Sequence, residues 1–155
     1  MFIIFIFSII FLISGIIEQI NHQKRVNSIP IRIHVNGTRG KSTTTRLIAG
    51  GLREAGFKVL AKTTGTLPRL IFEDGTETPL KRRGNPNIIE QLKIFKEAVK
   101  RKVDVLVVEC MAINPEPQWV SEHKMVKSTI GVITNVREDH LEDVGPGLDN
   151  MAELL

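Results

Sequence analysis

Apolar residues dominate the first seventeen positions of the chain and then recur in short runs between polar segments. The opening stretch MFIIFIFSIIFLISGII is interrupted only by two serines and one glycine, and the basic residues Lys24 and Arg25 follow it. Its length is at the short end of the ~17 to 25 apolar residues that cross a bilayer as a helix. The pattern predicts a transmembrane anchor over residues 1–20 and a juxtamembrane linker over residues 21–29.

A cleaved signal peptide and a buried helix are the alternatives to an anchor. The apolar run has no basic residues ahead of it and no cleavage site of the A-x-A kind. Lys24, Arg25 and Arg32 come after the run, and the positive-inside rule places the remainder of the chain in the cytoplasm. We therefore expect a single-pass protein of the cell membrane, with a cytoplasmic domain over residues 30–155.

Beyond the linker, strand signals and helix signals alternate. Alternating or continuous apolar runs predict strands, and apolar residues spaced by three and four predict helices. Strands are predicted over 29–35, 57–63, 103–109 and 129–136, and helices over 43–56, over about fifteen residues from Asn87, and before the last strand. Residues 68–87 are predicted to form an excursion with a candidate hairpin at EDGT. This order predicts an α/β fold, with a P-loop-type parallel sheet flanked by helices after the transmembrane helix.

The segment NGTRGKST joins the first predicted strand to the first predicted helix of the domain. Gly37 and Gly40 allow backbone amides to face a concavity, toward which the helix directs the positive end of its dipole. Lys41 would contact the β- and γ-phosphates of a nucleotide, and the Ser42 hydroxyl would ligate Mg²⁺. The usual P-loop has four residues between its glycines, whereas this loop has two. A glycine turn without a ligand is the alternative, and the strand and helix around it favour phosphate binding.

Two further segments place polar side chains at the carboxyl ends of predicted strands. Glu109 ends the run VLVVE, and Asn135, Asp139 and His140 follow the last strand within TNVREDHLED. Open α/β sheets bind their ligands at this edge, where a carboxylate can hold Mg²⁺. For these positions taken singly, a solvent-facing glutamate and a structural histidine remain open alternatives.

The composition limits the classes of function. Of the 155 residues, 42% are hydrophobic and 25% are charged, which is ordinary for a folded domain. The net charge of +4 is small and scattered, and aromatic residues are scarce after residue 12, which argues against a nucleic-acid partner. The one cysteine, Cys110, excludes an internal disulfide framework and a four-cysteine zinc site.

Four segments taken together make the sequence recognisable. The loop GTRGKST, the segment TTGT at 63–66, the strand VVECMA and the run TNVREDH resemble the ATP-dependent Mur ligase superfamily, and the domain is expected to match its central domain. With the anchor in front, the order of these segments is similar to the B subunits of poly-γ-glutamate synthases. The resemblance covers essentially the whole chain, although the loop alone is specific only for the superfamily.

The resemblance implies an ADP-forming amide ligation with ATP and Mg²⁺ as cofactors. A γ-carboxylate of the growing poly-γ-glutamate chain would be activated as an acyl phosphate, and the amine of free glutamate would then form the new amide. Small membrane subunits of a capsule synthase complex are the implied protein partners.

The resemblance also implies roles for single residues. The implied catalytic residues are Lys41, Glu109 and His140. The implied nucleotide-binding residues are Asn36, Gly37, Thr38, Arg39, Gly40, Lys41, Ser42, Thr43, Asn135 and Asp139. The implied metal ligands are Ser42, Thr64, Glu109 and His140, the histidine serving a second metal near the acyl phosphate.

The superfamily's carboxyl-terminal domain has no counterpart in this sequence. We therefore expect a fragment, a truncated product or one half of a split enzyme, which alone would bind nucleotide weakly and make no polymer. Two other functions stay open: a nucleotide-binding assembly subunit without catalysis, and a phosphotransferase with Asp139 as its base. Glutamate-dependent ADP release, measured with the carboxyl-terminal part supplied, would separate the ligase from both.

Overall fold

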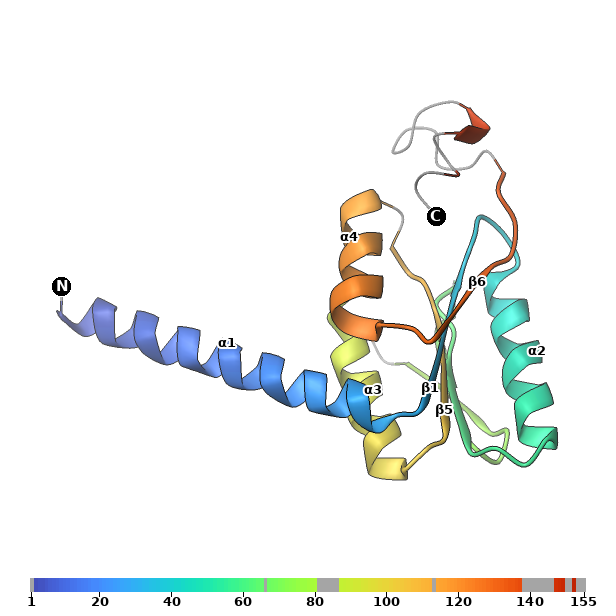
Figure 1. The fold of residues 1–155 in the computed structure, drawn as a ribbon, viewed down its shortest axis with the longest axis horizontal. Coiled ribbons are helices and arrows are strands. Elements are labelled where there is room, and N and C mark those ends of the chain that lie inside the picture. Colours follow the sequence, from blue (N-terminus) through green and yellow to red (C-terminus); the bar gives the residue numbers. More distant parts are fainter. Residues whose placement is uncertain are drawn as a thin grey trace.

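The computed structural model describes residues 2–65, 67–80, 87–112, 114–137, 147–149 and 152. The elements in chain order are α1 (Phe2–Ser28), β1 (Ile31–Asn36), α2 (Lys41–Glu54), β2 (Val59–Lys62), β3 (Arg69–Ile71), β4 (Glu77–Pro79), α3 (Glu90–Arg101), β5 (Val105–Glu109), α4 (Pro115–Val120), the π-helix η1 (Ser121–Val126) and β6 (Ile130–Ile133). The predicted α/β fold is confirmed, with each predicted strand and helix of the described part present within a few residues of its expected bounds (Figure 1).

One sheet joins all the described strands in the order β4-β3-β2-β5-β1-β6. β2, β5, β1 and β6 are parallel, as predicted, whereas β3 pairs antiparallel with β2 and with β4. The β3–β4 hairpin is the excursion expected at EDGT, and its turn places Gly75 at φ +82° while Asp74 accepts a hydrogen bond from the Thr76 amide. The sheet is therefore mixed, with a parallel centre and an antiparallel edge.

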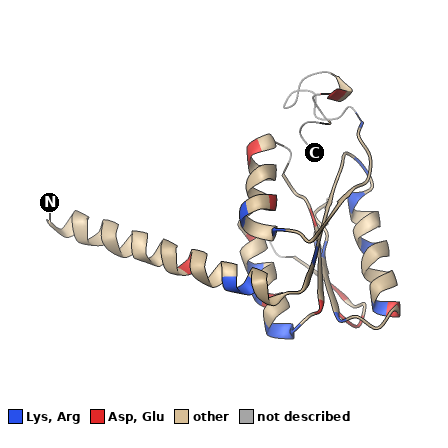
Figure 2. Cartoon of the chain, in the orientation of Figure 1, with Lys and Arg blue, Asp and Glu red and all other residues tan. Residues whose placement is uncertain are grey.

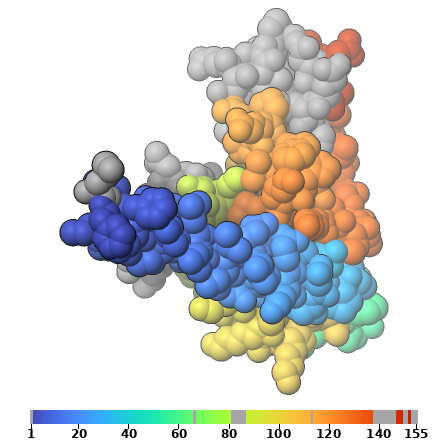
Figure 3. Space-filling model, turned by 60° about the vertical axis from the view of Figure 1, so that its left-hand side comes forward, coloured from blue at the N-terminus to red at the C-terminus, as the bar shows by residue number. Residues whose placement is uncertain are grey.

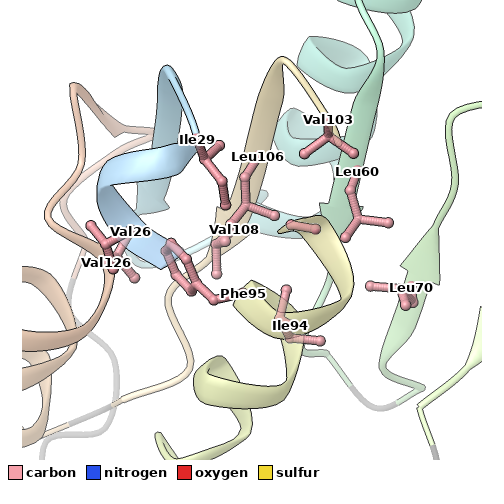
Figure 4. Close-up of a cluster of buried hydrophobic side chains, with 11 residues drawn as sticks. Val26, Ile29, Leu60, Leu70, Ile94, Phe95, Val103, Leu106, Val108 and Val126 are labelled. Carbon is pink, nitrogen blue, oxygen red and sulfur yellow. The ribbon is translucent and has the colours of Figure 1, made fainter. Parts of the chain in front are cut away.

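The centre of the sheet is buried on both faces. Every residue of β5 is buried, as its continuous apolar run predicts. One face packs on α3, the end of α1 and η1 through a cluster that includes Phe95, Leu106 and Val108 (Figure 4). The other face packs on α2 through Val35, Val107 and their neighbours. Alternate residues of each strand therefore belong to different layers of the molecule.

The helix boundaries follow local sequence signals. α2 ends at Glu54 and is followed by Gly56 at φ +90°, which confirms the predicted glycine at its carboxyl end. α3 has 12 residues, somewhat fewer than expected, and Asn87 accepts a hydrogen bond from the Ile89 amide just before it starts. The helix expected before the last strand is α4, which continues as the π-helical turn η1.

The segment 21–29, expected as a juxtamembrane linker, differs from that expectation. α1 continues unbroken through it to Ser28, and His22, Val26 and Ile29 are buried in the core of the domain. The sequence pattern missed this because only one side of this polar segment packs, and the few buried positions are separated by exposed ones. The helix that leaves the domain is thus also part of its core.

The first part of α1 has the length and composition of a membrane span. Its most apolar window has a mean hydropathy of 2.4, and none of that window is buried in the domain. α1 projects away from the domain on its own (Figure 1). A signal sequence near the amino terminus would have the same length and composition.

Candidate functional site

The glycine loop lies between the end of β1 and the start of α2, at the carboxyl edge of the parallel strands (Figure 1). Gly37 has φ +124°, and a Cβ built there would lie 2.2 Å from Thr134 Oγ1 and 2.9 Å from the Thr134 backbone nitrogen. Gly40, at φ +81°, immediately precedes the first residue of α2. Glycine is thus required at position 37 by the close approach of Thr134, and at position 40 by the turn into α2.

The segment after β6 holds this loop in place. Asn135 accepts hydrogen bonds from the amides of Thr38 (3.0 Å, through its carbonyl) and Arg39 (3.1 Å, through Oδ1). The Asn135 side chain also donates to the Arg39 carbonyl, as does the Thr134 hydroxyl. Asn135, predicted as a nucleotide-binding residue, therefore lies against the loop, where it fixes the loop's backbone.

Lys41 lies over the loop. Its Nζ donates to the carbonyl oxygens of Gly37 at 2.6 Å and Thr38 at 3.2 Å. An ammonium group has three hydrogens, so these two contacts leave donor capacity for an anionic oxygen. The cation is therefore placed at the loop, in the position from which a lysine can contact bound phosphate.

Glu109 lies beneath the loop, at the carboxyl end of β5, and is only 3% exposed. Its Oε2 accepts hydrogen bonds from the Ser42 hydroxyl and from the Thr64 amide, both at 2.7 Å. Gly65 follows Thr64, and a Cβ there would lie 3.3 Å from Ser42 Oγ. Ser42 and Thr64, predicted with Glu109 as ligands of one metal ion, therefore both contact Glu109.

This group has the chemistry of a magnesium site completed by phosphate. The Glu109 carboxylate and the Ser42 hydroxyl are hard oxygen ligands of the kind Mg²⁺ prefers, whereas Thr64 contacts Glu109 through its amide and directs its hydroxyl to the Cys110 carbonyl at 3.5 Å. The described residues contain no group of three or more His, Cys, Asp and Glu side chains placed to hold a metal. Mg²⁺ bound with a nucleotide keeps phosphate oxygens and waters as ligands, so a single carboxylate fits this role.

The remaining predicted residues are dispersed around the loop. Asn36, at the end of β1, donates to Gln118 Oε1 at 2.7 Å, which directs its side chain toward α4. Thr43 is exposed on the first turn of α2. Asp139 and His140 lie outside the described residues, so their predicted roles in supporting the site and in binding a second metal stay predictions.

Sequence reasoning missed a buried cation next to this edge of the sheet. Lys62, at the end of β2, has no exposed surface, and its Nζ lies 3.5 Å from Glu90 Oε2 and 3.4 Å from Met111 Sδ. The sequence did contain a signal for this ion pair, namely a lysine within an apolar strand. A buried ammonium requires a charged or polar partner, so such a lysine indicates that one lies nearby. The ion pair connects β2 to the start of α3.

A second ion pair, also missed, joins the buried His34 to the partly exposed Glu122 and lies on the same face of the sheet as Lys62. His34 Nδ1 is 2.7 Å from Glu122 Oε2, and both residues line a cavity of ≈ 540 Å³ between α4, η1 and β6. Burial alone lowers the pKa of His34, but hydrogen bonding to the Cys110 side chain and to Glu122 outweighs it and raises the pKa to about 9. Burial alone raises the pKa of Glu122, whereas His34 and Ser128 lower it to about 2. The pair is charged at neutral pH.

This pair predicts a pH-dependent stability. The raised pKa of His34 stabilises the fold fully below about pH 6.5, and that stabilisation is lost as the pH rises toward 9. The lowered pKa of Glu122 stabilises the fold fully above about pH 4.5, and that part is lost as the pH falls toward 2. Glu122→Gln should therefore lower the free energy of unfolding by about 1 to 2 kcal/mol at pH 5.5 and by less at pH 8.5. Urea unfolding followed by tryptophan fluorescence measures the free energy of unfolding at each of the two pH values.

Glu54→Gln, a substitution of an exposed glutamate at the end of α2, is the matched control. It should leave the free energy of unfolding unchanged at both pH values. An equal loss at both pH values in Glu122→Gln would show that His34 does not titrate in this range.

Comparison with known proteins identifies the fold and the family. The Mur ligase middle domain family matches residues 35–153. "Capsule biosynthesis protein CapB" of Bacillus anthracis is 51% identical over 155 residues, and "PGA synthase CapB" of Bacillus subtilis (strain 168) is 45% identical over 155 residues. A solved structure described as "FPGS-AMPPCP complex" superposes with a TM-score of 0.59 at 19% identity, over 88% of this chain and 40% of that one.

The alignments cover nearly all of this chain but only part of the relatives. They include 98% and 99% of the chain, yet 33% and 39% of the length of the two Bacillus proteins. The family match contains the glycine loop from Asn36 onward, together with Thr64, Glu109 and Asn135. The segments that first suggested the resemblance thus lie in the matched region, and the chain belongs to the Mur ligase family.

Proposed function

We propose that this chain is the nucleotide-binding part of a membrane-anchored, ATP-dependent amide ligase that extends poly-γ-glutamate in capsule synthesis. The observation that supports this most directly is the contact of Ser42 and Thr64 with the buried Glu109 beneath a glycine loop. The identity of 51% and 45% to the two CapB proteins supports the choice of poly-γ-glutamate within the family.

ATP binds at the glycine loop in this proposal. The amides of the loop and of the first turn of α2 contact the phosphates, and the positive end of the helix dipole favours their negative charge. Lys41 turns from the carbonyls of Gly37 and Thr38 to the terminal phosphates. The ATP-binding surface at the loop is completed or supported by Asn36, Arg39, Thr43, Asn135 and Asp139.

Ser42, Thr64 and Glu109 hold the Mg²⁺ that accompanies ATP, directly or through water, and His140 serves a second metal. The bound metal supplies positive charge that offsets the negative charge developing on the phosphates. The contact between Glu109 and Ser42 aligns the two groups before the nucleotide arrives. Because Glu109 is buried, its charge acts in a setting where solvent screens it weakly.

The reaction is an ADP-forming ligation. A carboxylate oxygen of the growing chain attacks the γ-phosphorus of ATP, and the bond from that phosphorus to the ADP oxygen breaks. The glutamate amine then attacks the carbonyl carbon of the acyl phosphate, loses a proton and displaces phosphate. Two anionic reactants must meet in this scheme, and in the proposal the positive charge of Lys41 lowers their repulsion, a role that its contact with the loop carbonyl of Gly37 supports.

The proposal includes insertion of α1 into the cell membrane, with the domain in the cytoplasm, where ATP is available. Small membrane subunits of a capsule synthase complex are the proposed partners. The domain boundaries, an anchor over 1–20 followed by a nucleotide-binding domain, belong to the same proposal, with the end of α1 assigned to the domain.

Lys41→Ala tests the assignment of the loop. We expect the variant to bind Mg-ATP about 10- to 100-fold more weakly, because one charge-assisted contact to phosphate contributes about 1.5 to 3 kcal/mol. Isothermal titration with a non-hydrolysable ATP analogue measures the change. The fold should be retained, since Lys41 is partly exposed and its contacts are confined to the loop.

Lys58→Ala removes an exposed lysine at the opposite edge of the sheet and is the matched control, with an expected affinity equal to that of the unmodified chain. Unchanged affinity in Lys41→Ala would contradict the assignment of the loop to phosphate. Intact nucleotide binding without glutamate-dependent ADP release in the full-length protein would favour a non-catalytic assembly subunit.

A further inference from the structure

The carboxyl-terminal end of α1 is fixed to the domain on several sides. The His22 ring nitrogen Nε2 lies 2.8 Å from the Met125 carbonyl oxygen. Arg32 Nη1 donates to the Ile29 carbonyl at 2.6 Å, just beyond the end of α1, and its Nε donates to the Lys127 carbonyl at 2.9 Å. Figure 3 shows this end of α1 packed against the orange segment that contains η1 and against the yellow α3. No flexible segment separates the helix from the domain.

The distance from the apolar run to the domain is short. Ile20 is the last large apolar residue of the exposed run, and His22 is already buried in the domain. Two residues of α-helix rise by about 3 Å, whereas charges interact in physiological salt over about 8 Å. With the apolar run in a bilayer, the surface around the base of α1 therefore lies at the level of the lipid headgroups.

The surface around the base of α1 is formed by α3, α4 and η1. α1 leaves the molecule on the side covered by α3, α4 and η1, while α2 and the glycine loop lie on the other face of the sheet (Figure 1). A bilayer around α1 would thus face α3, α4 and η1, and the nucleotide site would stay open to the cytoplasm.

Basic positions, blue in Figure 2, lie along the chain at the base of α1. Lys24 and Arg25 lie on the helix itself, Lys124 lies on η1 beside it, and Lys127 immediately follows η1. Lys127 Nζ donates to Gln23 Oε1 at 2.5 Å, which places it directly against α1. These four residues are named the basal cluster. Its cations lie close enough together that Arg25 and Lys127 both lower the pKa of His22, although burial lowers it most.

Acidic residues do not neutralise the basal cluster. On the described part of α1, α4 and η1, two exposed glutamates are present, Glu18 and Glu116. The third acidic side chain, Glu122, points inward to His34 and Ser128. The surface around the helix base therefore has an excess of positive charge.

An exposed tryptophan adjoins the basal cluster. Trp119 on α4 is 52% exposed, with its ring 5.0 Å from that of His123 and Lys124 Nζ 5.1 Å from the ring centroid. An aromatic ring with a lysine beside it suits the interface between headgroups and acyl chains, where tryptophan is enriched in membrane proteins.

We propose that the basal cluster and Trp119 rest against anionic phospholipid headgroups of the membrane that holds α1. This inference rests on the proposed insertion of α1. It adds that the domain has a defined face toward the lipid, kept there by the continuous helix and attracted by negative headgroups. Each basic residue near such a surface adds to the attraction, so the four residues of the cluster together are sufficient to hold this orientation.

Trp119 is the chain's single tryptophan, so its fluorescence reports on this contact directly. The full chain is reconstituted in lipid nanodiscs, either zwitterionic or with about 30% anionic phosphatidylglycerol, that contain a lipid spin-labelled at the headgroup. We expect strong quenching in the anionic discs, weaker quenching in the zwitterionic discs, and a loss of the difference at about 0.5 M NaCl. Retention of the chain in vesicles after alkaline carbonate washing tests the insertion separately.

Substitutions locate the contact. Lys124→Gln with Lys127→Gln should reduce the quenching in anionic discs by at least about half, because two of four cations are removed. Lys58→Gln with Lys102→Gln is the matched control. Lys102, like Lys127, is an exposed lysine with positive φ that follows a helix, and this control should leave the quenching unchanged.

The outcomes separate the inference from the proposed function. Loss of the chain from carbonate-washed vesicles overturns both the anchor and this inference. Retention without quenching of Trp119, or with equal quenching in the two lipid mixtures, overturns the inference and leaves the anchor standing. The salt dependence is measured on the unmodified chain, so the conclusion does not depend on the folding of the variants.

Discussion

Replacing Gly37 with alanine is expected to weaken ATP binding more than about 100-fold and to destabilise the domain by about 2 to 3 kcal/mol. The new Cβ would lie 2.2 Å from Thr134 Oγ1 and 2.9 Å from the Thr134 backbone nitrogen, at a φ of +124° that L-residues rarely adopt. The Thr134 hydroxyl could rotate, but the backbone could not yield without moving β6. The loop would therefore lose the position in which Asn135 holds it.

Two glycines with positive φ provide graded controls for Gly37→Ala. Gly40→Ala, where a Cβ meets nothing within 4 Å, should cost only the backbone strain of about 1 to 2 kcal/mol and a modest loss of affinity. Gly75→Ala, in the β3–β4 hairpin at φ +82°, should lower stability to a similar extent without changing ATP affinity. Thermal unfolding and calorimetric titration separate the two effects. Equal affinities of Gly37→Ala and Gly75→Ala would show that the close approach to Thr134 does not shape the site.

Glu109→Gln should remove the Mg²⁺ dependence of nucleotide binding. Glutamine keeps the size of the side chain and an oxygen that can accept from Ser42 and Thr64, but it removes the negative charge. We expect the affinity for Mg-ATP to fall about 100-fold, while the affinity for ATP in excess chelator changes little, because metal binding requires the carboxylate. Titrations with and without Mg²⁺ measure the difference.

Glu54→Gln is again the control, and its Mg²⁺ dependence should equal that of the unmodified chain. A parallel loss of affinity with and without Mg²⁺ in Glu109→Gln would indicate that Glu109 supports the loop structurally and has no part in binding metal. Retained Mg²⁺ dependence would assign the metal to other residues.

The sequence was sufficient for the elements of the domain because their signals are local. The continuous apolar run of β5, the spacing of apolar residues in α2 and Gly56 at its end each lie within a few residues of the feature they predict. The same holds for the glycine loop, whose chemistry depends on Gly37, Gly40 and Lys41. The polar end of α1 was misread, because its burial depends on α3 and η1, which are formed by residues far along the chain.

The arrangement of the site could be anticipated only where two segments end at the same edge of the sheet. Glu109 was predicted to lie near the loop because parallel strands present their carboxyl ends together. That its Oε2 is shared by Ser42, 67 residues away, and by Thr64, 45 residues away, depends on β5 lying between β1 and β2, which no local pattern specifies.

The sequence by itself determined that this chain has a long apolar helix, an α/β domain and a glycine loop between a strand and a helix, since each arises from spacing and residue type over short stretches. Only the tertiary structure decided which polar groups meet in the interior. His34 and Glu122 are 88 residues apart, and Lys62 and Glu90 lie on different elements, so their pairing is set by the order of the strands and the helices packed on them. Buried charges require partners, and the completed packing alone determines which side chain is close enough to serve as one.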